Sequence, residues 1–287
     1  MSALTRPGLV VVRGAGDIAT GAIQKLVHAG FDVVALEMAR PMAIRWRAAL
    51  CPAVHLGRWQ VEDLIGVRAA DWAAASNLLT TGAPGTVPVL VDPDAALLAE
   101  VTPWAVVDAI LAKRNVGTTA SMAPVVVGLG PGFTAGADVH FVVETMRGHH
   151  LGRVIAEGPA LPNTGIPGLI AGRAAERVLH SPAAGVVEVR HGIGDVVAEG
   201  DVVCVVHAAT GPTEVRASIG GVIRGMIPDG FEVPARFKIA DVDPRVELAA
   251  SVDTISDKSR AVGGATLDAV LQGLRRVGWR PTRGALG

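Results

Sequence analysis

Aromatic residues and cysteine are scarce in this sequence. Tyr is absent, aromatic residues make up 3% of the 287 positions, and Cys51 and Cys204 are the only cysteines. Because the two cysteines are far apart and form no C-x-x-C motif, a disulfide framework and a cysteine-rich zinc site are excluded. We therefore expect the protein to work in a reducing cytoplasm.

A strong charge of one sign and long apolar runs are also missing. The formal net charge is −1, and no basic stripe with interleaved aromatic residues is present, so we expect no binding of nucleic acid. No apolar run reaches the roughly 18 residues of a membrane helix, and the N-terminus lacks the apolar core of a signal peptide. These absences predict a soluble, cytoplasmic protein without membrane contact. Arg far outnumbers Lys, which we interpret as GC-rich coding rather than as a signal of function.

Apolar residues are abundant, at 50% of the sequence, which is enough for a large buried core. Up to about residue 180, short apolar runs alternate with segments whose apolar residues recur at helical spacing. The runs are too apolar for strands with one face in water, which is typical of a mostly parallel sheet covered by helices on both sides. The pattern predicts a Rossmann-like α/β domain over residues 8–180.

The pattern changes near His180, where helical spacing ends and valines alternate with small and polar residues. Residues 181–206 and 217–242 align without gaps, with glycines and valines at equivalent places. Neither copy can bury a core alone, so the repeat predicts two interlocked halves of a small β-sandwich. This β domain, expected over residues 181–245, resembles the barrel-sandwich hybrid of biotinyl and lipoyl domains. The segment between the halves has no Lys to carry a swinging arm, and residues 246–287 are expected to form a C-terminal helix and a flexible tail.

The first candidate site is the glycine-rich turn in "VVRGAGDIATG", residues 11–21, between an apolar run and a helical segment. Its G-x-G-x-x-A spacing is typical of a turn whose small residues let a pyrophosphate approach the backbone at a helix N-terminus. The next expected strand ends in an acid, near the place where a ribose hydroxyl pair is normally bound. The acid of the first helical turn would repel a phosphate, so a tight strand-to-helix corner remains the alternative. The candidate ligand-binding residues are Gly14, Gly16, Asp17, Gly21 and Glu37.

Two later segments at strand ends would complete this site. One expected strand ends at Asp108, and charges directly after a parallel strand point to the ligand side of the sheet. Lys and Arg at that place suit an anionic phosphate or carboxylate. The segment "GLGPGFTAG", residues 128–136, is a second glycine-rich loop, which either binds an anion or needs glycine only for its backbone angles. The candidate binding residues in these segments are Lys113, Arg114, Gly128, Gly130 and Gly132.

Catalytic and metal-binding residues have weaker signals. His140 and Glu144 lie on the same face of an expected strand and would form an acid–base pair or, with His149, bind a metal ion. No H-E-x-x-H or comparable spacing is present, so a polar strand face is the alternative. Asp108 is the third catalytic candidate. The loop at residues 158–168 is either a linker or a source of substrate contacts.

Several motifs together resemble one family. They are "VVRGAGDIATG", "VVDAILAKRNVGTT", "APVVVGLGPGFTAGADVHFVVETMRGHHLGRVI", "PNTGIPG", "IADVDPR" and "SDKSRAVGG". From about residue 8 to about residue 274, the chain resembles the YqeB-like family, which is named as selenium-dependent molybdenum hydroxylase system proteins. The N-terminal turn is similar to that of xanthine dehydrogenase accessory proteins.

The resemblance implies an accessory protein that matures a client molybdenum hydroxylase and binds a phosphate-bearing small molecule. Its cofactor would be the molybdenum-pterin cofactor or a dinucleotide, and enzymatic activity is left open. Two alternatives remain: an NAD(P)-dependent oxidoreductase with His140 as proton donor, and a non-catalytic scaffold whose β domain docks the client enzyme. The oligomeric state is also open, a homo-oligomer included.

Overall fold

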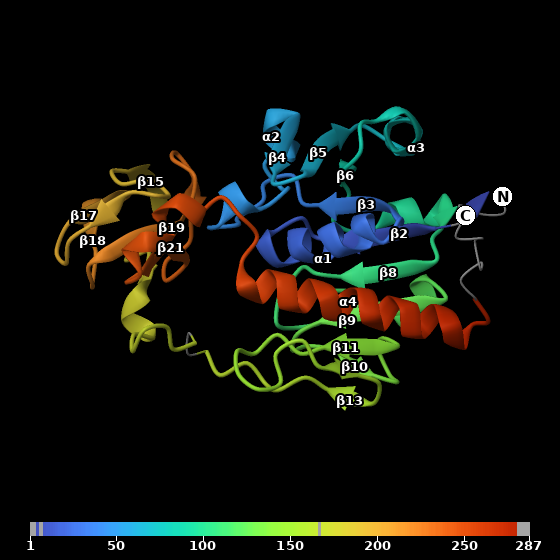
Figure 1. Cartoon of the computed structure of the whole chain (residues 1–287). Helices are drawn as coiled ribbons and strands as arrows, with labels where there is room; N and C mark the ends of the chain where they lie inside the picture. The colour runs from blue at the N-terminus through green and yellow to red at the C-terminus, as the bar shows by residue number, and fades with distance from the viewer. Residues whose placement is uncertain (1–3, 6–7, 166–167, 280–287) are drawn as a thin grey trace.

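The computed structural model describes residues 4–5, 8–165 and 168–279. The chain forms a larger α/β domain and a smaller β domain, which lie side by side in Figure 1, and the last helix returns from the β domain to the α/β domain. In the described part of the chain, no helix combines the length and the apolar character needed to cross a membrane. The tail expected after the last helix falls on residues 280–287, outside the described residues.

A nine-stranded sheet forms the centre of the α/β domain, in the order β12-β11-β9-β8-β2-β3-β6-β5-β4. The seven central strands are parallel, and β12 and β4 run antiparallel at the two edges. The strands are β2 (Leu9–Arg13), β3 (Asp32–Glu37), β4 (Arg58–Val61), β5 (Leu64–Ala69), β6 (Thr86–Val91), β8 (Ala105–Asp108), β9 (Val125–Leu129), β11 (Phe141–Val143) and β12 (Val154–Ile155). Two small pairs lie outside it, β1 (Leu4–Thr5) with β7 (Val101–Thr102) and β10 (Thr134–Ala135) with β13 (Gly158–Pro159).

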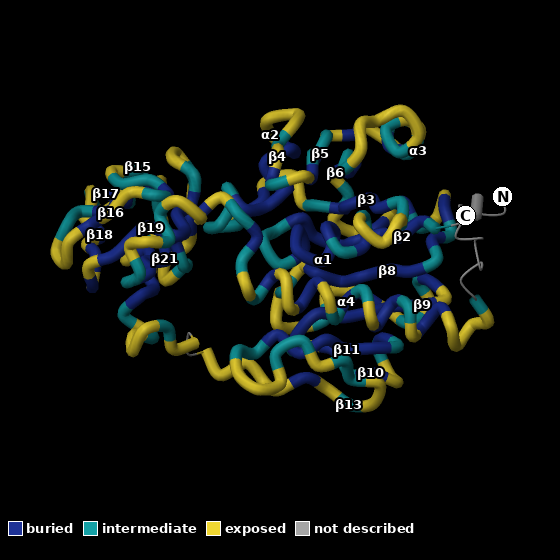
Figure 2. Tube along the Cα trace, in the orientation of Figure 1, coloured by how far each residue is buried: buried dark blue, intermediate teal, exposed yellow. Residues whose placement is uncertain are grey.

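Helices cover the sheet on both faces. Val10 and Val12 of β2 face the core that contains α1 (Asp17–His28) and α4 (Asp257–Arg276). Leu9 and Val11 face the opposite core, which contains α3 (Trp72–Thr81). Burial on both faces explains why the central strands are continuous apolar runs, and Figure 2 shows these strands as buried. The short helices are α2 (Ala53–Leu56) and the 3-10 turns Trp46–Ala48, Ala96–Ala99, Ala120–Met122, Ala175–Arg177 and Val246–Ser251.

Helices α1 and α4 cross in direct backbone contact. A Cβ atom on Gly263 would lie 2.2 Å from the carbonyl oxygen of Gly21, and a Cβ on Gly21 would lie 2.3 Å from the carbonyl oxygen of Ser259. Glycine is therefore required on both helices at this crossing. The contact brings the N-termini of α1 and α4 to the same end of the domain, beside the β domain (Figure 1).

The β domain consists of two four-stranded antiparallel sheets, in the orders β14-β21-β19-β16 and β18-β17-β15-β20. The repeat appears in the strands: each strand of the first copy recurs 36 positions later in the second. Strand β16 pairs with β19, and β20 pairs with β15, so each copy lends a strand to the other. The strands are β14 (Val178–His180), β15 (Gly185–Val189), β16 (Val196–Val197), β17 (Val202–Ala208), β18 (Gly211–Arg216), β19 (Gly221–Met226), β20 (Glu232–Val233) and β21 (Lys238–Asp243).

The expected fold class, a Rossmann-like domain followed by a barrel-sandwich-hybrid-like domain, was wrong. The structure has one large mixed sheet and two separate antiparallel sheets, rather than a Rossmann-like sheet joined to a biotinyl- or lipoyl-like barrel-sandwich domain. A tight reversal at one edge of the large sheet contributes to the first difference. Glu62, with φ of 52°, and Asp63 turn the chain between β4 and β5, so the edge strand runs antiparallel.

The two domains are joined more closely than the expected boundary at residue 180 suggests. Strand β14 lies before that boundary in sequence, yet it pairs with β21 of the β domain. Helix α4 follows the β domain in sequence, yet it packs on α1 of the α/β domain. The segment before α2 makes a further contact: the amide of Met226 donates to the carbonyl of Ile44, and Trp46 Nε1 donates to the carbonyl of Met226. These contacts fix the β domain against the carboxyl edge of the large sheet.

Candidate functional site

A cleft of about 730 Å³ lies where the β domain meets the α/β domain. Its walls come from the loops that follow β8, β9 and β11, from the first turns of α1 and α4, and from β19 and β21 of the β domain. Strands β3 and β8 lie on opposite sides of β2, so the chain reverses its direction across the sheet at this strand. In open parallel sheets, ligands bind beyond the carboxyl ends of strands at such a reversal point.

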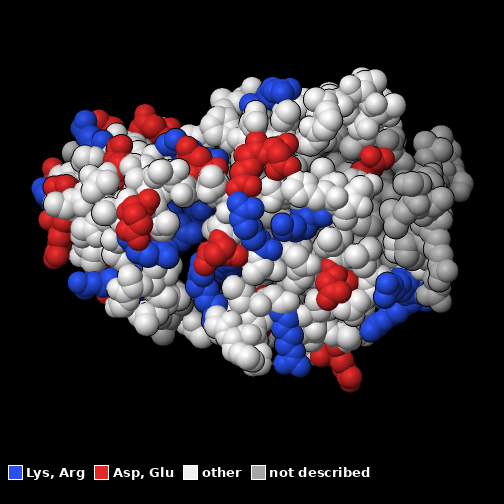
Figure 3. All heavy atoms as spheres, viewed as in Figure 1, with Lys and Arg blue, Asp and Glu red and all other residues white. Residues whose placement is uncertain are grey.

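Basic side chains dominate the lining of this cleft, which we call the basic cleft. Figure 3 shows Lys and Arg gathered at the boundary of the two domains. Ten of the lining residues carry charged side chains, seven basic and three acidic. The basic residues are Arg45, Lys113, Arg147, Arg177, Arg224, Lys238 and Lys258, and the acidic residues are Asp17, Glu144 and Asp241.

All three acids have partners inside the protein. Asp17 accepts a hydrogen bond from Arg45 at 2.9 Å, and Asp241 accepts one from the buried Arg177 at 2.9 Å. The two carboxylate oxygens of Glu144 accept from the backbone amides of Met146 and Leu161. The acids of the lining therefore neutralise two arginines and order one loop, and they form no ion pair with the other five cations that the structure describes in the cleft.

Two further arginines are paired with acids outside the lining. Arg147 holds Asp257 through two hydrogen bonds of 2.8 and 3.0 Å, which lowers the pKa of that carboxyl. Arg224 lies 3.6 Å from Asp243. Every arginine of the cleft thus has a carboxylate partner.

The three lysines differ from the arginines. Within the described residues, Lys113, Lys238 and Lys258 form no ion pair and no side-chain hydrogen bond. The pKa values of Lys238 and Lys258 are lowered, chiefly by burial, and the positive charge of Lys113 lowers both further. Asp17 acts in the opposite direction on both, so the ammonium groups of Lys238 and Lys258 lie within electrostatic reach of the first turn of α1.

Each lysine is placed by a different element. Lys113 lies in the loop after β8 with φ of 61°, and Leu111 of the same loop also has φ of 61°. Left-handed backbone is costly for residues other than glycine, and such strain is most frequent at functional sites. Lys238 begins β21, and Lys258 lies in the first turn of α4.

Helix N-termini add to the positive potential of the cleft. Asp17 and Ile18 at the start of α1 line it, as do Ser256 and Lys258 at the start of α4. Helices of 12 and 20 residues carry a partial positive charge and unpaired backbone amides at these ends. The N-termini of the two helices and the three lysines thus all make the electrostatic potential of the basic cleft more positive.

The glycine-rich turn after β2 adjoins the cleft, but the carboxylate of Glu37 beside it is already occupied by hydrogen bonds within the protein. Glu37 Oε2 accepts from the amide of Ala15 at 2.7 Å, and Oε1 accepts from Met38 at 2.9 Å. Burial raises the pKa of Glu37. Gly14 has φ of 99° and a Cβ there would meet the carbonyl of Ala109 at 2.9 Å, whereas a Cβ on Gly16 would meet nothing within 4 Å. Ligand binding at this turn stays a prediction.

The other predicted glycines have close neighbours that account for them. A Cβ on Gly128 would lie 2.5 Å from the ring of Phe133, and one on Gly130 would lie 2.6 Å from the hydroxyl of Thr145. At Gly132 it would lie 2.6 Å from the backbone of Arg114, and Gly21 belongs to the helix crossing described above. Packing alone requires glycine at these four positions.

Asp108 forms a buried polar network at the end of β8. Arg13 donates to the hydroxyl of Thr118 at 2.5 Å, and this hydroxyl donates to Asp108 at 2.6 Å. The Arg13 guanidinium lies 3.6 Å from the Asp108 carboxylate. This network fixes the start of the loop that carries Lys113, while the expected catalytic role of Asp108 stays untested.

The histidine candidates do not share a site with Glu144. His140 Nδ1 accepts from the amide of Val126 at 2.9 Å, and burial lowers the pKa of His140. His149 is exposed and its ring contacts that of His150 at 5.0 Å. Among the described residues, no three His, Cys, Asp or Glu side chains come close enough to hold a metal ion.

Sequence reasoning found Asp17, Lys113 and Glu144 of the basic cleft but missed Lys238, Lys258 and the paired arginines. A signal was present: the whole chain has four lysines against 22 arginines, and three of the four line this cleft. The excess of arginine, which we set aside as GC-rich coding, makes each remaining lysine informative. Lys258 and the segment after Lys238 also lie in the motifs that carry the family resemblance.

These features define an α/β protein with a basic cleft against a β domain, and comparisons place the chain among known proteins. It is 48% identical to YqeB of Escherichia coli (strain K12) over 278 residues, which cover 97% of this chain and 50% of that protein. This identity supports the YqeB-like family resemblance, and the chain spans about half the length of this relative. No family model matches the sequence.

Solved structures give only distant likenesses. An aspartoacylase family protein from Mesorhizobium loti matches with 15% identity and a TM-score of 0.26, over 84% of this chain and 86% of that one. The ectoine utilization protein EutE (DoeB) from Ruegeria pomeroyi matches with 13% identity and a TM-score of 0.27, over the same shares. At these scores the likenesses carry no argument for an activity in this chain.

The expected function is nevertheless corrected. The solved structures that match include an aspartoacylase family protein, a succinylglutamate desuccinylase and an ectoine utilization protein, and none of these is named as a molybdenum hydroxylase accessory protein. Maturation of a molybdenum hydroxylase, and the oxidoreductase and docking-scaffold alternatives, are therefore not proposed for this chain.

Proposed function

We propose that the protein binds a small molecule with two or more negative charges, of the phosphate-bearing class, in the basic cleft. The observation that carries the proposal is the set of three lysines, Lys113, Lys238 and Lys258, which face one cleft without an acidic partner among the described residues. Lys238 and Lys258 are partly buried, and holding ammonium groups close together without an ion-pair partner costs free energy. An anion in the cleft would supply the missing counter-charge.

The ligand class follows from the type of cation. Arginines of the cleft are engaged with carboxylates, which leaves lysines as the available donors. A lysine ammonium is a compact charge with three rotatable donors, and it commonly binds phosphate as a point charge. The two helix N-termini offer backbone amides that suit the oxygen atoms of the same group.

The size of the cleft agrees with a molecule larger than an inorganic ion. Ligand pockets for small organic molecules span about 300 to 1,000 Å³, and the basic cleft measures about 730 Å³. Apolar side chains from the loops, such as Leu111, Leu161 and Ile170, complete its lining. A phosphate group at the lysines would leave room for an organic body against these side chains.

The test is calorimetric titration of the purified chain with pyrophosphate at low salt. Replacing Lys238 or Lys258 by Met removes the charge and keeps the length of the side chain. Each substitution should weaken binding by about tenfold to hundredfold, because a charge-assisted hydrogen bond contributes roughly 1.5 to 3 kcal/mol. Lys113→Met should have the same direction with a smaller effect, because Lys113 is exposed.

Lys25→Met is the matched control, because Lys25 lies in the last turn of α1, at the end away from the cleft. It should leave pyrophosphate binding unchanged, and circular dichroism should show the same fold for all four variants. Absence of binding to the unsubstituted chain at millimolar pyrophosphate would overturn the proposal. So would an equal loss of affinity in Lys25→Met.

A further inference from the structure

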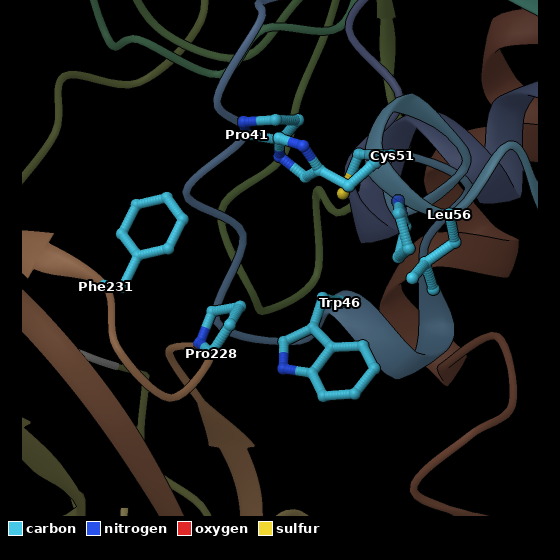
Figure 4. Close-up of a pocket in the computed structure, with 8 residues that line it drawn as sticks. Pro41, Trp46, Cys51, Leu56, Pro228 and Phe231 are labelled. Carbon is cyan, nitrogen blue, oxygen red and sulfur yellow. The ribbon is translucent and has the colours of Figure 1, made fainter. Parts of the chain in front are cut away.

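A second cavity, of about 270 Å³, lies on the other side of the segment that carries Arg45. Its lining is almost entirely apolar, and we call it the apolar pocket. Figure 4 shows Phe231 and Pro228 of the β domain facing Cys51 and Leu56 of the α/β domain across an open space, with Trp46 and Pro41 between them. Pro52 and His55 complete the lining.

The walls of the apolar pocket are flat and held in place. Trp46 Nε1 donates to the carbonyl of Met226 at 3.0 Å, and the indole packs on Trp59 with ring centroids 5.7 Å apart. Phe231 and three prolines provide further flat surfaces. Rigid walls of this kind favour a flat ring, because ring faces stack and proline loses no side-chain entropy on contact.

The volume sets the size of the occupant. A cavity of roughly 150 Å³ lined by apolar side chains holds benzene, and the apolar pocket is almost twice as large. Two fused aromatic rings therefore match the space better than a single ring. Leu56, whose side chain is 60% exposed, lies at its rim, so a ligand can enter without unfolding.

The charges near the two ends of the apolar pocket differ, and this difference would orient a charged ligand in it. Burial, together with the negative charges of Glu37 and Asp17, raises the pKa of the Cys51 thiol, so the inner end is apolar with a negative potential behind it. Arg40 is exposed and lies over the Phe231 ring, 5.4 Å from its centroid. Within the described residues, Arg40 has no ion pair, so its guanidinium is available to an anionic group at the outer end.

We infer that the apolar pocket is a second ligand site, distinct from the basic cleft, which takes an aromatic carboxylate with its ring between Trp46 and Phe231 and its carboxylate toward Arg40. This inference does not depend on the proposed function. The basic cleft binds through lysine charge, whereas this site binds through ring contact and needs only one cation.

The probe is 2-naphthoate, with binding followed by equilibrium dialysis of the full chain. Leu56→Trp fills the rim with an indole at an exposed position and should abolish binding. Val196→Trp is the matched control, because Val196 is 58% exposed and lies in β16, outside the pocket lining. It should bind like the unsubstituted chain.

A second pair of variants tests the role of charge. Arg40→Gln should weaken 2-naphthoate about tenfold, in line with loss of a charge-assisted contact, and should leave binding of the neutral 2-naphthamide unchanged. The same change at the exposed Arg58 should affect neither probe. Equal affinity of Arg40→Gln for 2-naphthoate would overturn the assignment of the carboxylate.

The outcomes separate the two sites. Loss of 2-naphthoate binding in Leu56→Trp with unchanged pyrophosphate binding supports the apolar pocket as a site of its own. No binding of 2-naphthoate to the unsubstituted chain at millimolar concentration overturns the inference. Binding that survives Leu56→Trp and disappears in Lys238→Met also overturns it, because the carboxylate then occupies the basic cleft.

Discussion

The basic cleft and the apolar pocket lie on opposite sides of one short segment, yet the first is lined by many charged side chains and the second mainly by apolar ones. Arg45 lines the first and Trp46, the next residue, lines the second. Arg45 immediately precedes the 3-10 turn that begins at Trp46, and the hydrogen bond from the amide of Met226 to the carbonyl of Ile44 holds this segment against the β domain. A single anchored segment can therefore wall two sites, one that relies on uncompensated charge and one that relies on ring contact.

The largest expected effect comes from breaking the buried network of Arg13, Thr118 and Asp108, which should weaken ligand binding in the basic cleft but not in the apolar pocket. Asp108→Ala leaves the Arg13 guanidinium buried without its carboxylate, which should lower the free energy of unfolding by about 3 to 5 kcal/mol. Pyrophosphate binding should weaken, because the loop with Lys113 loses its anchor, while 2-naphthoate binding persists in the folded fraction. Urea denaturation measures the loss, with the exposed Asp94→Ala as control. A loss below about 1 kcal/mol would contradict this role.

Two adjacent glycines of α4 give the next prediction, with opposite signs. Gly263→Ala places a Cβ 2.2 Å from the Gly21 carbonyl oxygen and should destabilise the protein by about 2 kcal/mol. Gly264 has nothing within 4 Å of its Cβ position and is exposed, so Gly264→Ala should stabilise it by about 0.5 to 1 kcal/mol. Because α4 carries Lys258, only the first change should weaken pyrophosphate binding. Equal effects of both changes would refute the close crossing.

The dependence on pH should distinguish the lysines of the basic cleft from the apolar pocket. Burial lowers the pKa values of Lys238 and Lys258, so both lose their protons below the ordinary pH range of lysine. Affinity for trimetaphosphate, which keeps its charge over this range, should fall about tenfold between about pH 7 and about pH 10. Binding of 2-naphthamide should stay constant.

The same two lysines should make stability rise with pH, whereas they make ligand affinity fall with pH. Between the lowered pKa and the ordinary value, the unfolded chain binds more protons than the folded chain, so the free energy of unfolding rises with pH in this window. The double variant Lys238→Met/Lys258→Met should flatten both curves. A pH profile of trimetaphosphate affinity that is unchanged in the double variant would assign the effect to other groups.

The smallest expected effect concerns the segment that the two sites share. Trp46→Phe removes the hydrogen bond to the Met226 carbonyl and should lower the free energy of unfolding by about 1 kcal/mol. Trp59 is the matched control, since its buried Nε1 has no partner among the described residues. Trp59→Phe removes an unsatisfied donor and should cost less. A larger loss at Trp59 would show that ring packing, not the hydrogen bond, holds the segment.

Sequence patterns predicted the local features of the fold better than its edges. The parallel strands were recognisable because burial on both faces makes each of them a continuous apolar run, and the repeat was recognisable because equivalent strands recur at one interval. The antiparallel edge strand β4 was missed, because it depends on a turn at Glu62 and Asp63 that contains no glycine or proline. The wrong fold class followed from that omission and from the analogy to carrier domains.

The candidate site was predictable only in part. Asp17 and Lys113 were found because strand ends and helix starts meet at one edge of a parallel sheet. The glycines at 21 and 128–132 could not be interpreted from sequence alone, because a glycine that admits a phosphate and a glycine that admits a neighbouring backbone are identical in sequence. Only the positions of Ser259, Phe133 and their neighbours show that packing accounts for them.

By itself, then, the sequence determined the buried strands, the repeated β halves and the last helix, because each depends on spacing within a short segment. The tertiary structure alone decided that Lys113, Lys238 and Lys258 share a cleft and that Arg45 and Trp46 line different cavities. The lysines are separated by up to 145 positions, and their proximity depends on the return of α4 to α1 and on the docking of β21. Charge acts through space rather than along the chain, so no local pattern could reveal where three unpaired cations meet.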